Sequence, residues 1–229
     1  LIDFNTGKIS RDEYGRYGNP TRAVAEAKLA ALDGAEEAVL FSSGMGAIVS
    51  VLLAMLSSGS HVVIMDECYR RTRQFCLEVL PRYGIDVTFV KTGDYVAMEQ
   101  AITDQTRLIV SESPTNPYLN VIDLERISRI AKDKRLKVMI DSTFATPYNQ
   151  RPIEFGIDIV VHSATKSLGG HNDLMAGVVA GSKALMGAIR EFRDVTGGIT
   201  DPHTAYLLIR GLKTFALRMD RHNANGMAI

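Results

Sequence analysis

The 229-residue chain has no tryptophan, two cysteines and no net charge, since 26 basic side chains balance 26 acidic ones. A neutral chain gives no electrostatic reason to expect nucleic acid or an anionic membrane as a partner. No apolar stretch approaches the length of a membrane-spanning helix. Cys68 and Cys76 fit neither a zinc nor a redox spacing, so we expect a reducing compartment, the cytoplasm or, in a plant, the plastid stroma.

Two further classes of site lack their sequence signals. His162 and His171 are nine residues apart with a lysine between them, and the other three histidines are isolated. We therefore predict no metal site. No Gly-x-Ser-x-Gly motif occurs, which argues against a serine hydrolase.

Short β-branched apolar runs alternate with longer segments of helical period, and this pattern predicts an α/β fold with a mostly parallel sheet flanked by helices. The expected strands are residues 38–43, 61–66, 86–91, 107–111, 137–141, 158–163 and 176–180. The expected helices are residues 20–32, 44–56, 71–82, 95–102, 124–134, 182–195 and 203–217.

The pattern also suggests a division of the chain. Residues 1–19 are rich in Asn, Gly, Tyr and charge, and we expect them to form an N-terminal arm. Residues 20–229 would form one large domain. Because the sequence begins at Leu1 without a Met and ends at Ile229 within a helical pattern, we expect a fragment, a core domain trimmed on both sides.

Open α/β sheets bind ligands beyond the carboxyl ends of their strands. Gly44 and Gly46 follow the first strand and open a helix, whose free N–H groups suit a phosphate. A plain tight turn would explain these glycines too. So would a dinucleotide fingerprint with Asp66 as its ribose-binding acid, although Val49 stands at the third glycine position.

Asp141 and Lys166 each follow an apolar strand. Asp141 either caps the next turn or holds a protonated ring nitrogen, since a carboxylate among apolar side chains needs a partner. Lys166 is either solvated or a nucleophile that can form a Schiff base.

The remaining polar groups have phosphate and stacking chemistry. Ser163 and Thr165 could bind a phosphate, as could Tyr14 with Arg16, while Tyr69 could stack on a planar ring or pack on the surface. Phosphate donors, an acid for a ring nitrogen, a stacking aromatic and an amine nucleophile together suit pyridoxal 5′-phosphate (PLP).

The same residues resemble the Cys/Met-metabolism family of fold-type I PLP enzymes and, within it, the cystathionine γ-synthases. The matching stretches are residues 14–21 (YGRYGNPT), 42–47 (SSGMGA), 68–73 (CYRRTR), 112–117 (ESPTNP), 140–147 (IDSTFATP) and 162–177 (HSATKSLGGHNDLMAG). The resemblance implies an aspartate aminotransferase-like large domain. It also implies that a C-terminal domain with the substrate-carboxylate arginine is absent from this chain, so that the piece alone could be inactive.

The resemblance assigns roles to individual residues. Lys166 would carry the cofactor and move protons, aided by Tyr69 stacked on the ring, while Asp141 would pair with the ring nitrogen. The other cofactor contacts would be Gly44, Met45, Ser163 and Thr165 at the phosphate, Asn116 near the 3′-oxygen, Thr143 near the ring, and Tyr14 and Arg16 at the phosphate of a neighbouring subunit.

The implied reaction is γ-replacement, in which an O-activated homoserine and cysteine give cystathionine. The implied assembly is a homodimer or a tetramer of dimers with shared active sites. The near alternative is a lyase or a homoserine sulfhydrylase with the same cofactor. The distant ones are an NAD-dependent dehydrogenase and a non-catalytic paralogue.

Overall fold

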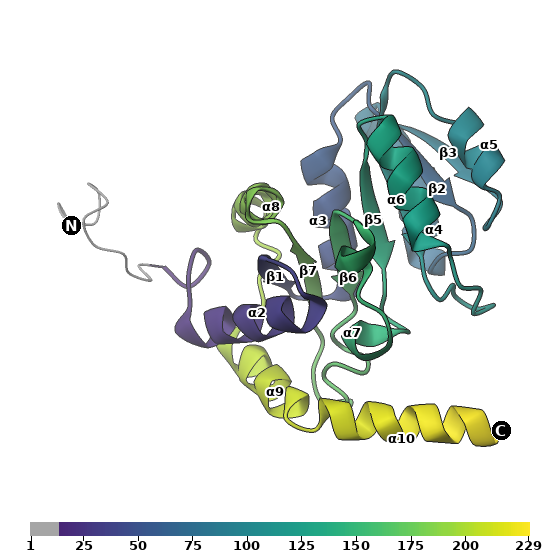
Figure 1. Ribbon diagram of the computed structural model, residues 1–229. Coiled ribbons are helices and arrows are strands. Elements are labelled where there is room, and N and C mark those ends of the chain that lie inside the picture. Colours follow the sequence, from purple (N-terminus) through teal and green to yellow (C-terminus); the bar gives the residue numbers. More distant parts are fainter. Residues whose placement is uncertain (1–13) are drawn as a thin grey trace.

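The computed structural model describes residues 14–229, so most of the expected N-terminal arm lies outside the described residues. One seven-stranded sheet runs in the order β1-β7-β6-β5-β4-β2-β3 (Figure 1). Only β7 is antiparallel to its two neighbours, β1 and β6. The strands are β1 (Glu37–Phe41), β2 (His61–Met65), β3 (Asp86–Val90), β4 (Thr106–Glu112), β5 (Lys137–Asp141), β6 (Ile159–His162) and β7 (Gly177–Gly181).

Helices cover both faces of the sheet, because its strands are apolar on both sides. On β5, Met139 packs with one hydrophobic cluster, whereas its neighbours Val138 and Ile140 pack with another. The first face is covered by α3 (Gly44–Met55), α4 (Arg70–Glu78) and α8 (Lys183–Thr196). The second face is covered by α2 (Pro20–Asp33), α5 (Tyr95–Gln100), α6 (Leu124–Asp133) and α9 (Pro202–Leu212).

The mostly parallel sheet flanked by helices confirms the expected fold class, and two expected helices are corrected. The helix expected over residues 71–82 is α4 followed by a separate 3-10 turn, η1 (Leu80–Tyr83), because Pro81 lies near its start. The helix expected over residues 203–217 is divided into α9 and α10 (Phe215–Ala228). The short helix α7 (Thr146–Asn149) and the 3-10 turn η2 (Pro152–Phe155) lie between β5 and β6.

The parallel strands β1, β2, β4, β5 and β6 all end at one edge of the sheet, called here the carboxyl edge. Since β7 is reversed, it begins at that edge, where Gly177 is paired with Phe41 of β1. Loops that contain the polar residues of the sequence motifs therefore meet there. Among residues 14–229, no helix has both the length and the hydropathy of a membrane span.

Candidate active site at the carboxyl edge

A cavity of about 430 Å³ opens at the carboxyl edge of the sheet. That volume falls within the range of small-molecule and cofactor sites. Nine of the eleven site residues expected from the sequence line it: Gly44, Met45, Tyr69, Asn116, Asp141, Thr143, Ser163, Thr165 and Lys166. The cavity therefore gathers residues from five different connections of the sheet.

The start of α3 forms one wall of the cavity. Ser43 caps this helix by accepting a hydrogen bond from the N–H of Gly46 at 3.0 Å. Gly44 lies so close to β6 that a Cβ added to it would be 2.9 Å from Ser163 Cβ. The first amides of a helix have no intrahelical acceptor and carry the positive end of its dipole. This wall can therefore bind a phosphate with backbone N–H groups and the nearby Ser163 hydroxyl.

Asp141, at the end of β5, is oriented by the residues that follow it. Its Oδ1 accepts hydrogen bonds from Thr143 N at 3.0 Å and from Thr143 Oγ1 at 2.5 Å. The same hydroxyl accepts from Ser163 N at 2.8 Å, which joins the ends of β5 and β6. Within the described part of the chain, no hydrogen-bond donor reaches Asp141 Oδ2. One carboxylate oxygen is thus left for a cationic group in the cavity.

Two carboxyl groups share this region. Burial raises the pKa of Asp141, although its hydrogen bonds from Thr143 and the nearby His162 act in the opposite direction. Burial, together with the charge of Asp141, raises the pKa of Glu112 to about 8. A positive group between them would stabilise both carboxylates.

Lys166 is exposed and lies on residues 163–176, called here the lysine loop, which connects β6 to β7. Thr165 closes this loop: its N–H and its hydroxyl both donate to Ala176 O at 3.1 Å, and its hydroxyl accepts from Ala176 N at 3.0 Å. The donor of the Thr165 hydroxyl is therefore used inside the loop, and the Ser163 hydroxyl is the better placed of the two for a phosphate.

Residues of α9 and α10 contact the backbone of the lysine loop and hold it in place. Arg218 Nη1 donates to Ser167 O at 2.6 Å, and Nη2 donates to Gly211 O at 3.0 Å. Gly211 itself packs directly against the loop, because a Cβ added there would overlap Gly169 O. One arginine thus fixes the backbone next to Lys166.

Tyr69 and Asn116 lie on two neighbouring loops at the mouth of the cavity. Tyr69 precedes α4, and its N–H donates to Glu112 Oε2 at 2.7 Å. Asn116 is half-buried and follows Thr115, whose hydroxyl donates to Glu67 Oε2 at 2.8 Å. The loop that positions the aromatic ring and the loop that positions the amide are therefore hydrogen-bonded to each other.

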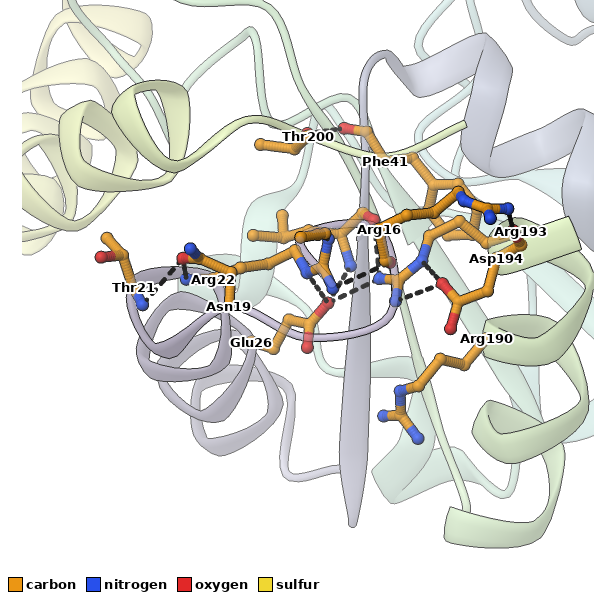
Figure 2. Close-up of polar contacts among 12 residues, drawn as sticks. Arg16, Asn19, Thr21, Arg22, Glu26, Phe41, Arg190, Arg193, Asp194 and Thr200 are labelled. Carbon is orange, nitrogen blue, oxygen red and sulfur yellow. Dashed lines mark hydrogen bonds and ion pairs between the residues drawn. The ribbon is translucent and has the colours of Figure 1, made fainter. Parts of the chain in front are cut away.

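Tyr14 and Arg16 lie away from this cavity. Arg16 Nη1 donates to the carbonyl of Asp194 on α8 at 2.7 Å, and its guanidinium carbon is 4.7 Å from the Tyr17 ring centroid. Figure 2 shows Arg16 beside Arg193 and Asp194. Tyr14 is 57% exposed. Their expected role at the site of a neighbouring subunit stays a prediction.

Five more residues line the cavity to which the sequence analysis assigned no role: Ser43, Ile48, Glu112, Phe144 and Met175. Glu112 had a usable signal, since it ends an apolar strand as Asp141 does. Asp66, the acid of the dinucleotide alternative, instead accepts hydrogen bonds from Thr92 N at 2.9 Å and Thr92 Oγ1 at 3.1 Å. Its carboxylate stabilises the turn after β3, which removes the main support for that alternative.

Comparison with known proteins places this geometry in context. The family described as "Cys/Met metabolism PLP-dependent enzyme" matches residues 3–229. Cystathionine gamma-synthase 1 of Nicotiana tabacum, a chloroplastic protein, is 45% identical over 228 residues, 99% of this chain and 42% of that protein. L-methionine gamma-lyase of Fusobacterium nucleatum subsp. nucleatum is 46% identical over 219 residues, 94% of this chain and 55% of that protein.

Solved structures agree with these matches. The metB crystal structure from Corynebacterium glutamicum superposes with a TM-score of 0.91 at 38% identity, covering 94% of this chain and 57% of that one. The cystathionine gamma-lyase of Lactobacillus plantarum, complexed with L-serine, gives a TM-score of 0.88 at 40% identity, covering 91% of this chain and 55% of that one. The chain spans about half the length of the curated relatives it matches.

Proposed function

The chain belongs to the Cys/Met metabolism PLP-dependent enzyme family, and on that premise we propose that its protein catalyses γ-replacement, forming cystathionine from an O-activated homoserine and cysteine. The single observation that carries the assignment of PLP chemistry to this site is the cavity in which Asp141, Lys166 and Tyr69 lie together. The activity is proposed for the whole protein of which this chain is part.

The residues around the cavity fit the chemical groups of PLP. The Gly44 and Met45 end of α3, with Ser163, would hold the phosphate by backbone and hydroxyl donors. Asp141 would face the ring nitrogen through the carboxylate oxygen that Thr143 leaves free. We assign Asn116 to the 3′-oxygen of the cofactor, Thr165 to the closure of the lysine loop beside the phosphate, and Tyr69 to one face of the ring.

When bound, PLP supplies an electron sink that stabilises negative charge on the carbon next to an amino group. In this proposal Lys166 binds the cofactor through Nζ and removes and returns the proton at Cα of the substrate. The Tyr69 hydroxyl serves as a second proton carrier at the mouth of the cavity. Asp141 keeps the ring nitrogen cationic, and Thr143 keeps Asp141 in place.

Two lines of support favour γ-replacement. Cystathionine gamma-synthases of Nicotiana tabacum and Arabidopsis thaliana match nearly the whole chain at 45% and 46% identity. The segment Gly170–Asp173 that follows Lys166 reads GHND, which favours a synthase without deciding the reaction. A second candidate, the γ-lyase reaction, is supported by the methionine gamma-lyases, which match at the same level of identity.

Product analysis of the full-length protein tests the proposal. With O-acyl- or O-phosphohomoserine and cysteine, we expect cystathionine and the released acid, and no product in the Lys166→Ala variant. Ammonia and a 2-oxo acid without cystathionine would instead establish the lyase. Borohydride reduction followed by peptide mass spectrometry should attach the cofactor to the peptide that contains Lys166.

We also propose a compartment and an assembly. Cys68 and Cys76 are both free thiols and both buried, which suits a reducing compartment, the cytoplasm or a plastid stroma. The proposed working unit is a homodimer or a pair of such dimers, with Tyr14 and Arg16 directed to the neighbouring site.

A further inference from the structure

Two glutamates link the loop after β2 to the loop after β4 at the mouth of the cavity. One glutamate comes from each side, and each accepts hydrogen bonds from the other side. Glu112, at the end of β4, accepts from Tyr69 N at 2.7 Å in the loop after β2. Glu67, in that loop, accepts from Thr115 Oγ1 at 2.8 Å and Asn120 Nδ2 at 2.6 Å in the loop after β4. The two glutamates make similar contacts, but their surroundings differ.

Glu112 is 4% exposed and lies beside a second carboxylic acid. Glu112 and Asp141 are register partners on the parallel strands β4 and β5. Adjacent strands are about 4.8 Å apart and register partners share a face, so both side chains line the wall of the same cavity. Two carboxylates so close together in a desolvated wall disfavour each other's charge.

The other charged and titratable groups of this region come from the elements around the cavity. His162, at the end of β6, acts on Asp141 and lowers its pKa, against the effect of burial. Cys68 is buried in the loop before Tyr69. Its burial and the charges of Glu112, Asp141 and Asp66 raise the pKa of its thiol, and that of Arg73 lowers it. Lys166 from the lysine loop lines the same cavity. Arg73 is not among the residues that line the cavity, and its guanidinium carbon lies over the ring of Phe89, 4.4 Å from the ring centroid.

We propose that Glu112 is a positioning residue. When a cation binds at Asp141, Glu112 gives up the proton that the two carboxyl groups share, and the change in its charge alters how firmly Tyr69 is held in place. The proposal rests on the assignment of Asp141 to the ring nitrogen of the cofactor. In the empty cavity the pair holds one proton. A cation bound at Asp141 cancels the repulsion, and Glu112 then ionises.

An ionised Glu112 is a stronger acceptor for the Tyr69 N–H than a neutral one, since charge-assisted hydrogen bonds are shorter and about twice as strong. Loading the cavity therefore tightens the loop that places the Tyr69 ring. The raised pKa of Glu112, about 8, agrees with a proton that is held near neutral pH and ready to leave. Glu67 accepts its hydrogen bonds from Thr115 and Asn120, neither of which carries a charge, so Glu67 links the two loops but takes no part in the coupling.

The proton count on cofactor binding tests this coupling. PLP is titrated into the cofactor-free full-length protein near pH 7, in two buffers of different ionisation enthalpy, and the protons released are obtained by calorimetry. We expect the wild type to release close to one proton more than the Glu112→Gln variant, which keeps an amide acceptor for Tyr69 N but has no proton to lose. The matched Glu67→Gln variant should release as many protons as the wild type.

Equal counts in the wild type and the Glu112→Gln variant would overturn the proposal, because a merely structural Glu112 leaves the count unchanged. Infrared difference spectra between the PLP-bound and the PLP-free wild type test the same point. They need no variant, so they do not depend on whether a variant folds. The protonated-carboxyl band should disappear on loading, and its persistence would overturn the coupling. If PLP did not bind the wild type at all, the proposed function and not the coupling would be at fault.

Discussion

Thr143 Oγ1 donates to Asp141 Oδ1 at 2.5 Å, and this one hydroxyl also accepts from Ser163 N at 2.8 Å. A hydroxyl that accepts from the first backbone N–H of the lysine loop while it donates to Asp141 fixes the carboxylate relative to that loop. It also stabilises the charged form of Asp141, because hydrogen bonds to a carboxylate lower its pKa.

Replacement of Thr143 by valine should therefore weaken cofactor binding. Valine keeps the shape but removes the donor, so the pKa of Asp141 rises further and the site loses its ring-nitrogen partner at a higher pH. We expect a loss of about 10-fold to 100-fold in affinity for PLP, the equivalent of one charge-assisted hydrogen bond. Absorbance titration at several pH values measures it. Thr143→Ser should stay close to the wild type, and an unchanged Thr143→Val affinity would contradict the assignment.

Arg218 offers a test of how the lysine loop is positioned. Arg218→Met removes the donors to Ser167 O and Gly211 O, so Lys166 loses the backbone that fixes it. We expect kcat of the full-length enzyme to fall about 10-fold to 100-fold, with a smaller change in KM, because a small displacement of a reacting group has effects of that size.

Arg221→Met on the same helix is the matched control, since Arg221 is exposed. It should leave both kcat and protease resistance of the lysine loop unchanged, whereas Arg218→Met should increase cleavage within residues 163–176. Equal effects of the two variants would show that Arg218 merely stabilises α10.

A buried pair, His162 and Asp33, predicts a pH dependence of stability. His162 Nε2 lies 3.0 Å from Asp33 Oδ1, and both side chains are at most 1% exposed. Burial opposes the charge of His162, but Asp33, and to a smaller extent Asp141 and the Ser142 backbone, leave its pKa above the ordinary value of 6.5. A raised pKa in the folded state means that the pair stabilises fully below pH 6.5 and loses this effect as the pH rises through the folded-state pKa.

The difference in urea midpoint between wild type and Asp33→Asn should therefore be largest in mild acid and shrink as the pH rises. His61 is the contrasting histidine: burial lowers its pKa, and its ring contacts Thr106 Oγ1 at 2.7 Å and Thr88 Oγ1 at 2.9 Å. Its contribution should be lost as the pH falls. A pH-independent difference for Asp33→Asn would show that His162 is neutral in the folded protein.

The proposed role of Arg16 across a dimer predicts complementation between two inactive variants. Arg16→Ala and Lys166→Ala subunits, co-expressed at full length, should form hybrids in which one of the two sites has both residues. With random pairing, half of the dimers are hybrids, so we expect about a quarter of wild-type activity. If Arg16 acted within its own subunit, the hybrids would have no complete site and no activity would return.

The arrangement of the cavity could be predicted from the sequence because the residues with reactive side chains lie at the ends of strands. Asp141 and Lys166 follow apolar strands, and parallel strands end at one edge, so pattern and topology suffice to bring them together. The role of Arg218 was beyond such reasoning. It donates to the carbonyl of Ser167, 51 positions away, and no local pattern in α10 reveals which backbone an arginine will meet.

Glu112 shows a different limit. Its position at a strand end was evident, but its pairing with Asp141 depends on the register between β4 and β5, which a shift of one residue would have abolished. The break between α9 and α10 was missed for a related reason. The helical period continues across it, and the close packing of Gly211 against the lysine loop is a tertiary contact.

The reversed direction of β7 has a consequence for how such enzymes can change. Every other connection at the carboxyl edge leads into a helix, whose packing dictates the length of the loop. The lysine loop instead joins two antiparallel neighbours, β6 and β7, and starts and finishes at the same place. Antiparallel neighbours need no crossover, so no helix sets the length of this connection. Its shape is set instead by side-chain and backbone contacts, from Arg218 to Ser167 and from Thr165 to Ala176. The segment that carries the amine is therefore the one whose position a single distant side chain can change.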